Sequence, residues 1–252
     1  MEKKNLCVAF STQKGGAGKS TMTVLVASYL HYVKGYNVAV VDCDYPQYSI
    51  AGLRKRELKI AQEDEYYRSL AYEHFTRLGK KMYPVVKSLP IKAGETAKVL
   101  IEKNSYDIIF FDLPGTVNQE GVIHTISQMD YIFSPISADR VVLESTLRFA
   151  SRLNDTIITT GKSRIKGLHL IWNLVDGREK SELYDVYEAI IAQLQLPVMK
   201  TFLPDSKRFR RELSITHKPL FRSTLFPVDK ALLKGSNVDL LTDELLNIVN
   251  SK

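Results

Sequence analysis

The sequence predicts an α/β fold. It should have a doubly wound, mostly parallel sheet of about seven strands, with helices on both faces. Short apolar runs alternate along the 252 residues with longer segments of helical pattern. Most of these runs are continuous, which is typical of strands covered by helices on both faces. With 44% hydrophobic residues and no repeat or flexible linker, residues 1–252 are expected to form a single domain.

Each element follows from its local composition. Strands are expected where apolar residues that favour strands concentrate, at residues 6–11, 37–41, 83–87, 108–111, 131–135, 168–172 and 198–202. Helical patterns lie between or after them, at residues 21–34, 57–78, 93–104, 145–160, 182–195 and 239–249. Gly35 is placed to end the first helix. In a sheet of this kind, ligands bind at the carboxyl ends of the strands.

The two cysteines, Cys7 and Cys43, lie in apolar runs and have no metal-ligand spacing. They predict buried thiols in a reducing compartment rather than a disulfide framework. The N-terminus lacks the longer apolar stretch of a signal peptide, and no run approaches the ~20 apolar residues that span a bilayer. We therefore expect a cytoplasmic protein.

The positive charge is concentrated in one segment. Residues 200–234 hold nine basic and three acidic residues, a net charge of +6 within a chain of +7. A surplus so localised favours a polyanionic partner.

Residues 12–21 read TQKGGAGKST and stand between the first strand and the first helix. Glycines in this position let backbone N–H groups turn inward around a phosphate, and the helix N-terminus adds positive charge. The residues of this phosphate loop are Gly15, Gly16, Ala17, Gly18, Lys19, Ser20 and Thr21. Lys19 would reach the β- and γ-phosphates of a nucleotide, and Ser20 would ligate Mg²⁺. Thr21 is placed to bond the α-phosphate.

The loop departs from the common pattern, because Gln13 stands where a glycine is usual and Lys14 precedes the glycines. The resulting pattern, K-G-G-x-G-K-[ST]-T, resembles the ParA/MinD family of ATPases with a deviant Walker A motif. The resemblance implies an ATP- and Mg²⁺-dependent ATPase that forms a homodimer. It further implies that Lys14 reaches across the dimer interface to the phosphates of the other subunit, much as an arginine finger acts in trans.

Two carboxylate motifs follow in the expected order. VVDCDYPQYS resembles the family pattern D-x-D-P-Q, in which Asp44 would position the attacking water, although Tyr45 interrupts the pattern before Pro46. A carboxylate that caps the following turn is the alternative. In this family's manner, YDIIFFDLPGT would place Asp112 to hold Mg²⁺ through water, and Gly115 to sense the γ-phosphate. Lys14, Lys19 and Asp44 are the expected catalytic residues.

Two later segments extend the resemblance. HLIWNLVDGR resembles the family segment whose asparagine, here Asn173, faces the edge of adenine. The alternative is an asparagine in a turn at the end of a strand. FLPDSKRFRREL resembles the family loop that runs past the base, here with Pro204. The second segment also holds the predicted DNA-binding residues Lys207, Arg208, Arg210 and Arg211, with Phe209 turned to the core. A solvated basic surface is the alternative for this cluster.

Stretches such as FFDLPGTVN look most similar to ParA-like, TraA-type proteins of conjugative transposons. The resemblance implies nonspecific DNA binding in the ATP state, with hydrolysis stimulated by a ParB-like or relaxosome protein. Only about ten residues precede the loop, so no N-terminal helix-turn-helix domain is expected. A MinD-like role in positioning a protein or membrane-bound cargo is the alternative, but the acidic last helix is a poor match for lipid. An iron–sulfur reductase of the nitrogenase type is nearly excluded. It would need cysteines after the third and fourth strands, and Cys7 and Cys43 lie elsewhere.

Overall fold

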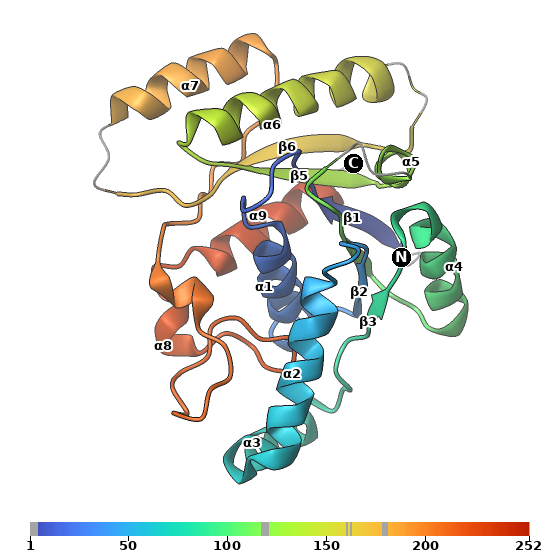
Figure 1. Ribbon diagram of the computed structural model, residues 1–252, viewed down its shortest axis with the longest axis vertical. Helices are drawn as coiled ribbons and strands as arrows, with labels where there is room; N and C mark the ends of the chain where they lie inside the picture. Colours follow the sequence, from blue (N-terminus) through green and yellow to red (C-terminus); the bar gives the residue numbers. More distant parts are fainter. Residues whose placement is uncertain (1–4, 117–120, 160, 162, 178–180, 252) are drawn as a thin grey trace.

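A computed structural model describes residues 5–116, 121–159, 161, 163–177 and 181–251 (Figure 1). Its centre is one six-stranded sheet, with all strand pairs parallel, in the order β3-β2-β4-β1-β5-β6. The strands are β1 (Leu6–Phe10), β2 (Val38–Asp42), β3 (Val85–Lys87), β4 (Ile108–Asp112), β5 (Tyr131–Ile136) and β6 (Gly167–Trp172). This confirms the predicted doubly wound class, with six strands where about seven were expected.

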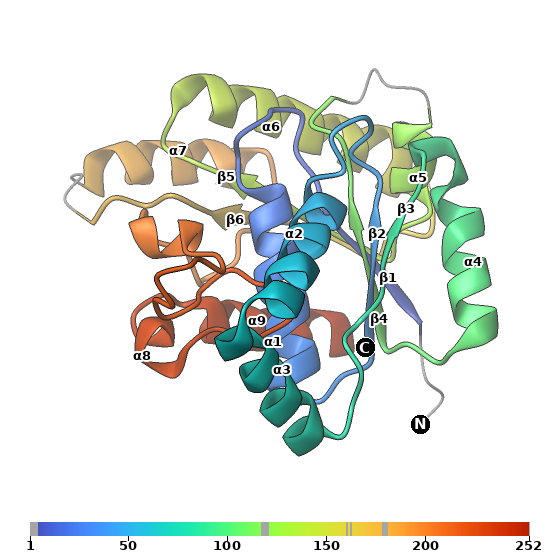
Figure 2. The same cartoon turned by 60° about the horizontal axis from the view of Figure 1, so that its bottom comes forward.

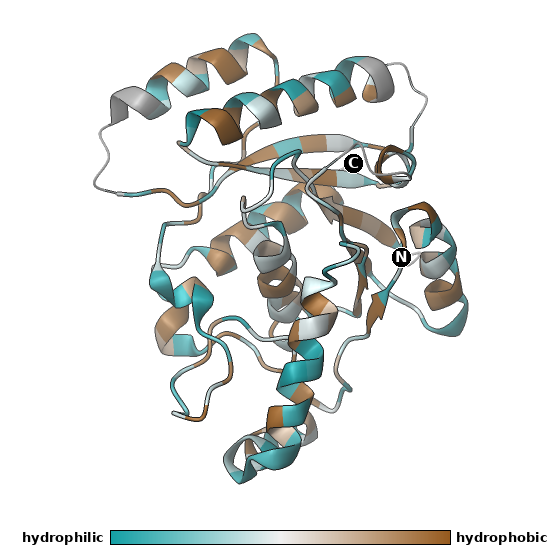
Figure 3. Cartoon of the chain, viewed as in Figure 1, coloured by the Kyte–Doolittle hydropathy of each residue, from teal (hydrophilic) through white to brown (hydrophobic). Residues whose placement is uncertain are grey.

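Helices cover both faces of the sheet, as the continuous apolar strands predicted (Figure 2). One face packs against α1 (Lys19–Tyr32) and α9 (Val238–Asn250). The other packs against α4 (Ala93–Lys103), α5 (Val122–Ser127), α6 (Arg140–Leu153) and α7 (Ser181–Gln193). Figure 3 shows mostly apolar residues on the central strands, whereas the outlying helix α3 is mostly hydrophilic.

Two helices replace the single one predicted over residues 57–78. They are α2 (Ser49–Glu63) and α3 (Glu65–Leu78), which pack against each other. The break is at Asp64, whose backbone is extended and whose carboxylate accepts the N–H groups of Tyr66 and Tyr67. An aspartate in this position begins a new helix by satisfying its first free N–H groups.

The remaining short elements are the 3-10 helices η1 (Pro90–Lys92) and η3 (Lys207–Arg210), the π-helical turn η2 (Asn154–Ile158) and α8 (Lys230–Leu233). Both cysteines are unpaired and buried, as predicted. Across the described ranges, no helix combines the length and the apolar character needed to cross a bilayer.

The seventh strand, predicted at residues 198–202, does not form. Met199 N–H donates to Leu170 O at 2.8 Å, and Leu203 N–H donates to Trp172 O at 2.9 Å, so the segment does run beside β6. Between these two hydrogen bonds the segment advances by four residues, whereas β6 advances by two. The N–H groups of Lys200 and Thr201 are instead bound by the carboxylate of Glu244 on α9, at 2.7 and 2.8 Å. A side chain from the C-terminal helix thus interrupts the ladder.

Candidate functional site

The phosphate loop joins β1 to α1 at the carboxyl edge of the sheet, as predicted. Gly16 and Gly18 adopt φ values of 80° and 90°, a left-handed conformation that favours glycine. A Cβ on Gly18 would also lie 2.5 Å from Nδ2 of Asn173. Gly15 and Gly16 are exposed, whereas Ala17 is buried. The loop therefore has the turned backbone that a phosphate cradle needs, and its glycine side faces solvent.

Lys19 begins α1 and is buried, with only 8% of its surface exposed. Its Nζ donates to the carbonyl of Lys14 at 3.4 Å. Burial lowers the pKa of Lys19, while the charges of Asp112 and Asp44 act in the opposite direction. The three residues thus interact across the ends of β1, β2 and β4, which is the arrangement that the motif order predicted.

Asp112 ends β4 and is fully buried, yet among the residues that the structure describes neither carboxylate oxygen has a hydrogen-bond partner. Its pKa is raised from 3.8 to about 7, chiefly by burial and also by the charge of Asp42, whereas the neighbouring Ser20 hydroxyl acts in the opposite direction. A buried carboxylate without partners is costly unless a cation or donor is supplied. Within the described residues, no group of three or more His, Cys, Asp or Glu side chains could hold a metal. Asp112 and Ser20 therefore fit a Mg²⁺ ion that takes its other ligands from a nucleotide and water.

Asp42 and Asp44 have different surroundings. Asp42, in register with Asp112 on the adjacent strand, is fully buried and accepts the N–H groups of Ala51 at 2.8 Å and Asp44 at 3.3 Å. It therefore holds the start of α2 in place. Asp44 is partly exposed; burial raises its pKa, whereas the charge of Lys19 lowers it.

The extra Tyr45 is accommodated in a turn after Asp44, in which Tyr48 N–H donates to Asp44 O at 2.7 Å. Tyr45 is 49% exposed and its ring contacts that of Tyr48. The additional residue thus lies after the carboxylate, and Asp44 remains beside Lys19. Its role in positioning water stays a prediction.

Gly115 lies against the phosphate loop. A Cβ at this position would be 3.1 Å from Gly15 N and 3.2 Å from Lys19 Nζ. The loop that follows β4 therefore approaches the phosphate cradle closely, at a spacing that only a glycine permits without adjustment. This placement is consistent with a γ-phosphate sensor, which remains a prediction.

Lys14 is exposed and stands at the rim of the loop. Its backbone N–H donates to Thr12 Oγ1 at 3.4 Å, and its carbonyl accepts the Lys19 amine. Among the described residues, the Lys14 ammonium group has no ion-pair partner. Its main chain thus shapes the loop, while its side chain is available to another molecule.

Asn173 and Pro204 lie close together at the end of β6, where Val175 pairs with Pro204. Asn173 is buried, and its Nδ2 donates to Ala17 O at 2.9 Å. The side chain therefore ties β6 to the phosphate loop, a contact that the sequence did not predict. Pairing with adenine would have to use the remaining N–H group and the oxygen of the Asn173 amide. Contact with the base stays a prediction for both Asn173 and Pro204.

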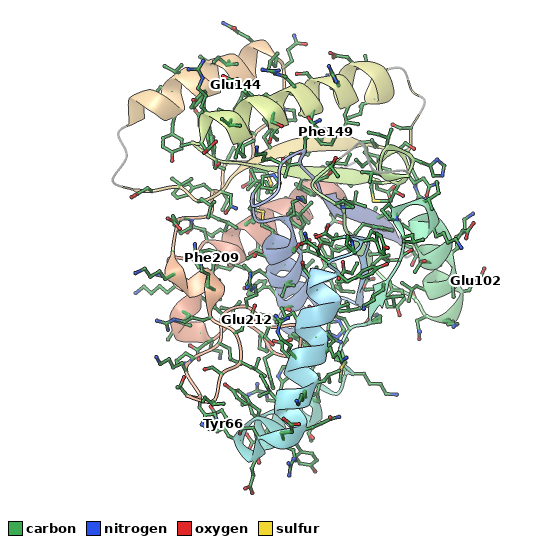
Figure 4. The ribbon with its side chains drawn as sticks, viewed as in Figure 1. Tyr66, Glu102, Glu144, Phe149, Phe209 and Glu212 are labelled. Atoms are coloured by element: carbon green, nitrogen blue, oxygen red, sulfur yellow. The ribbon has the colours of Figure 1, made fainter. Side chains whose placement is uncertain are left out.

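The basic cluster is only partly as predicted. Lys207, Arg210 and Arg211 are exposed, and Phe209 packs on Phe221 with ring centroids 4.8 Å apart (Figure 4). Arg208, in contrast, donates through Nη1 to the carbonyls of Leu232 and Lys234, at 2.9 and 2.8 Å. Through Nη1 it satisfies the end of α8, and its contact with DNA stays a prediction. The sequence could not reveal this, because the accepting carbonyls lie more than 20 residues away.

One charged residue beside the phosphate loop was missed altogether. Arg222 Nη1 donates to Thr21 Oγ1 at 2.7 Å, and Arg222 also pairs with Glu212. The residue belonged to the basic segment in the sequence, with no motif that would separate it from its neighbours.

Comparisons with known proteins agree with this geometry. The uncharacterized protein BBD21 of Borreliella burgdorferi is 23% identical over 254 residues, covering 92% of this chain and 96% of that protein. The cell division ATPase MinD of Pyrococcus furiosus has a TM-score of 0.62 at 18% identity, covering 97% of this chain and 100% of that one. A putative plasmid partition protein of Borrelia burgdorferi bound to AMPPNP has a TM-score of 0.56 at 16% identity, covering 96% and 98%.

A family model, the CobQ/CobB/MinD/ParA nucleotide binding domain, matches residues 8–219. This range contains the phosphate loop, Asp44, Asp112, Asn173 and the basic cluster. Because this model matches more than half of the chain, the chain belongs to the CobQ/CobB/MinD/ParA family of nucleotide-binding domains.

Proposed function

We propose that the protein is a ParA-type ATPase that dimerises in the presence of ATP, binds DNA nonspecifically in that state, and serves DNA partitioning or conjugative transfer. The observation that carries the proposal is the exposed ammonium group of Lys14 at the rim of a ready-made phosphate loop. A cation there is available to the phosphates of a second subunit. The fold shared with a partition protein that binds AMPPNP supports this reading.

The residues divide the work between binding and hydrolysis. The amides of the loop and Lys19 bind the phosphates, while Ser20 and Asp112 would hold Mg²⁺, which neutralises charge on the triphosphate. Asp44 orients a water for attack. Lys14 of the other subunit stabilises the charge that develops as the phosphate leaves. Turnover is slow alone and faster with a ParB-like or relaxosome partner.

A membrane-positioning role of the MinD type has less support. The apolar residues Val238, Leu241, Leu245 and Val249 of α9 are buried. Its acidic residues Asp243 and Glu244 are bound to Lys34 and to the backbone of residues 200–201. The apolar face of α9 is therefore already occupied within the fold, and DNA remains the better polyanionic partner.

Light scattering after gel filtration tests the proposal on the wild-type chain. With ATP and Mg²⁺, and most clearly in the Asp44→Ala variant that retains its nucleotide, the mass should double and the protein should elute with plasmid DNA. With ADP it should remain monomeric and elute apart from DNA. A single mass in both nucleotides would contradict ATP-driven association, and DNA retention in ADP would contradict the proposed switch.

The basic cluster predicts a specific loss of DNA binding. The double change Arg210→Glu and Arg211→Glu should abolish DNA retention in ATP, because each reversal replaces a phosphate contact by repulsion. ATP affinity should be unchanged, since both residues lie outside the phosphate loop. The matched control is Lys98→Glu with Lys103→Glu on α4, which gives the same net charge elsewhere. Equal DNA loss in both variants would show that only net charge matters.

A further inference from the structure

Arg222 connects the start of α1 to the C-terminal part of the chain. Its guanidinium donates through Nη1 to Thr21 Oγ1 at 2.7 Å, and through Nε and Nη2 to Glu212 Oε1 at 3.1 and 2.6 Å. The Arg222 side chain is only 26% exposed. Glu212 thus holds the guanidinium plane, and one N–H group is directed at the phosphate loop (Figure 4 labels Glu212).

This contact fixes the direction of the Thr21 hydroxyl. A guanidinium has donors and no acceptor, so Thr21 Oγ1 must accept, and its own hydrogen is left to be donated elsewhere. A threonine hydroxyl in a helix usually donates its hydrogen to the carbonyl four residues earlier, as Thr23 does to Lys19 O at 3.0 Å. For Thr21 that carbonyl belongs to Ala17, one of whose lone pairs already accepts Asn173 Nδ2 at 2.9 Å.

The backbone on both sides of this contact is anchored. Arg222 N–H donates to Arg211 O at 2.9 Å, and Ser223 O accepts the hydroxyl of Ser28 on α1 at 2.6 Å. Next along the chain, buried Thr224 is bound by Arg54 and Glu57 of α2. The position of Arg222 is therefore set by a buried polar network that joins α1, α2 and residues 222–224.

Space for a ligand lies beside the pair. A cavity of about 420 Å³ is lined by residues of α1, the start of α2 and the C-terminal segment, among them Ser20, Thr21, Tyr48, Arg56, Glu212 and Arg222. The cavity reaches the phosphate loop at Ser20 and Thr21, where an anion would meet both the hydroxyl hydrogen and the guanidinium charge.

We infer that Arg222 is a positioning residue for the nucleotide: it acts through Thr21, whose hydroxyl it holds as a donor to the α-phosphate. This rests on the proposed binding of ATP. Because ADP and ATP share the α-phosphate, Arg222 contributes equally to the affinity for both. In this respect it differs from Lys14, whose role depends on the second subunit.

Calorimetric titration of the apo protein with ADP·Mg²⁺ and ATP·Mg²⁺ tests the inference without measuring turnover. Arg222→Ala and Thr21→Val should each weaken both nucleotides by about 10-fold or more, the effect expected of a charge-assisted hydrogen bond. The double variant should be little worse than either single one, because both remove the same interaction. Lys59→Ala, which removes an exposed charge on α2 whose partner is Glu63 and which lies outside the cavity lining, should bind normally.

The outcomes separate the two claims. If the wild-type chain binds neither nucleotide, the proposed function fails and this inference fails with it. If the wild type binds but both single variants retain its affinity, the role of Arg222 is refuted while the ATPase proposal stands. Additive losses in the double variant would also refute it. Thr21→Val leaves the pair between Arg222 and Glu212 in place, so a folding defect in Arg222→Ala would not obscure the result.

Discussion

Replacing Asp112 by asparagine should weaken Mg²⁺-dependent ATP binding by about 10- to 100-fold and, at the same time, make the apo protein more stable. The wild-type carboxylate is fully buried and has no hydrogen-bond partner in the described part of the chain. Asparagine removes the charge at nearly constant volume. Where the wild-type carboxylate is ionised, the gain in the free energy of unfolding should be about 1–3 kcal/mol, because the asparagine amide is equally buried but carries no charge. A substitution that weakens ligand binding but raises the free energy of unfolding indicates a residue whose role is to bind the ligand.

The gain should depend on pH. Burial raises the pKa of Asp112 from 3.8 to about 7, so between these values the unfolded chain ionises while the folded protein keeps its proton. Wild-type stability is therefore lost as the pH rises through this window. The asparagine variant does not titrate, so its advantage should grow from pH 5 to pH 8. Urea unfolding in the absence of nucleotide and divalent cations measures this difference.

The matched control is Asp42→Asn, at the same register position on the neighbouring strand. Asp42 accepts two backbone N–H groups, and an amide that presents its NH₂ to one of them loses that bond. This variant should be less stable than the wild type. If both asparagine variants shifted stability in the same direction, the lack of partners at Asp112 would not be the cause.

The sequence was most informative where structure depends on neighbours along the chain. The apolar runs predicted six strands within one or two residues, and the spacing of lysine, glycine and serine placed the phosphate loop between β1 and α1. Because parallel strands end at one edge, the order of motifs sufficed to bring Asp44 and Asp112 to Lys19.

The sequence was less informative where a distant group binds the backbone or a charged side chain. Residues 198–202 have a strand composition, but Glu244 takes two of their N–H groups. Arg208 looks like its basic neighbours, yet carbonyls of residues 232 and 234 hold it. Arg222 reaches Thr21 across 201 positions of sequence. Such pairings leave no periodic pattern, so only the folded chain reveals them.

Replacing Lys14 by alanine should leave nucleotide affinity of the monomer almost unchanged but abolish ATP-dependent dimerisation, with turnover reduced by about 10³-fold or more. The loop should keep its shape, because Lys19 contacts the carbonyl of Lys14 and not its side chain. The matched variant Lys19→Ala should lose nucleotide binding itself, because its buried amine is inside the cradle. Calorimetry, light scattering and phosphate release separate these effects.

Mixing two inactive variants decides whether Lys14 acts across the interface. Asp44→Ala lacks the water-positioning carboxylate but keeps Lys14, whereas Lys14→Ala keeps Asp44. If each lysine serves the other subunit, a mixed dimer holds one complete site, made of the Asp44 of one chain and the Lys14 of its partner. Phosphate release should then reappear on mixing. If Lys14 served its own pocket, neither chain would be complete and the mixture would stay inactive, which would refute the trans-acting role on which the proposed dimer rests.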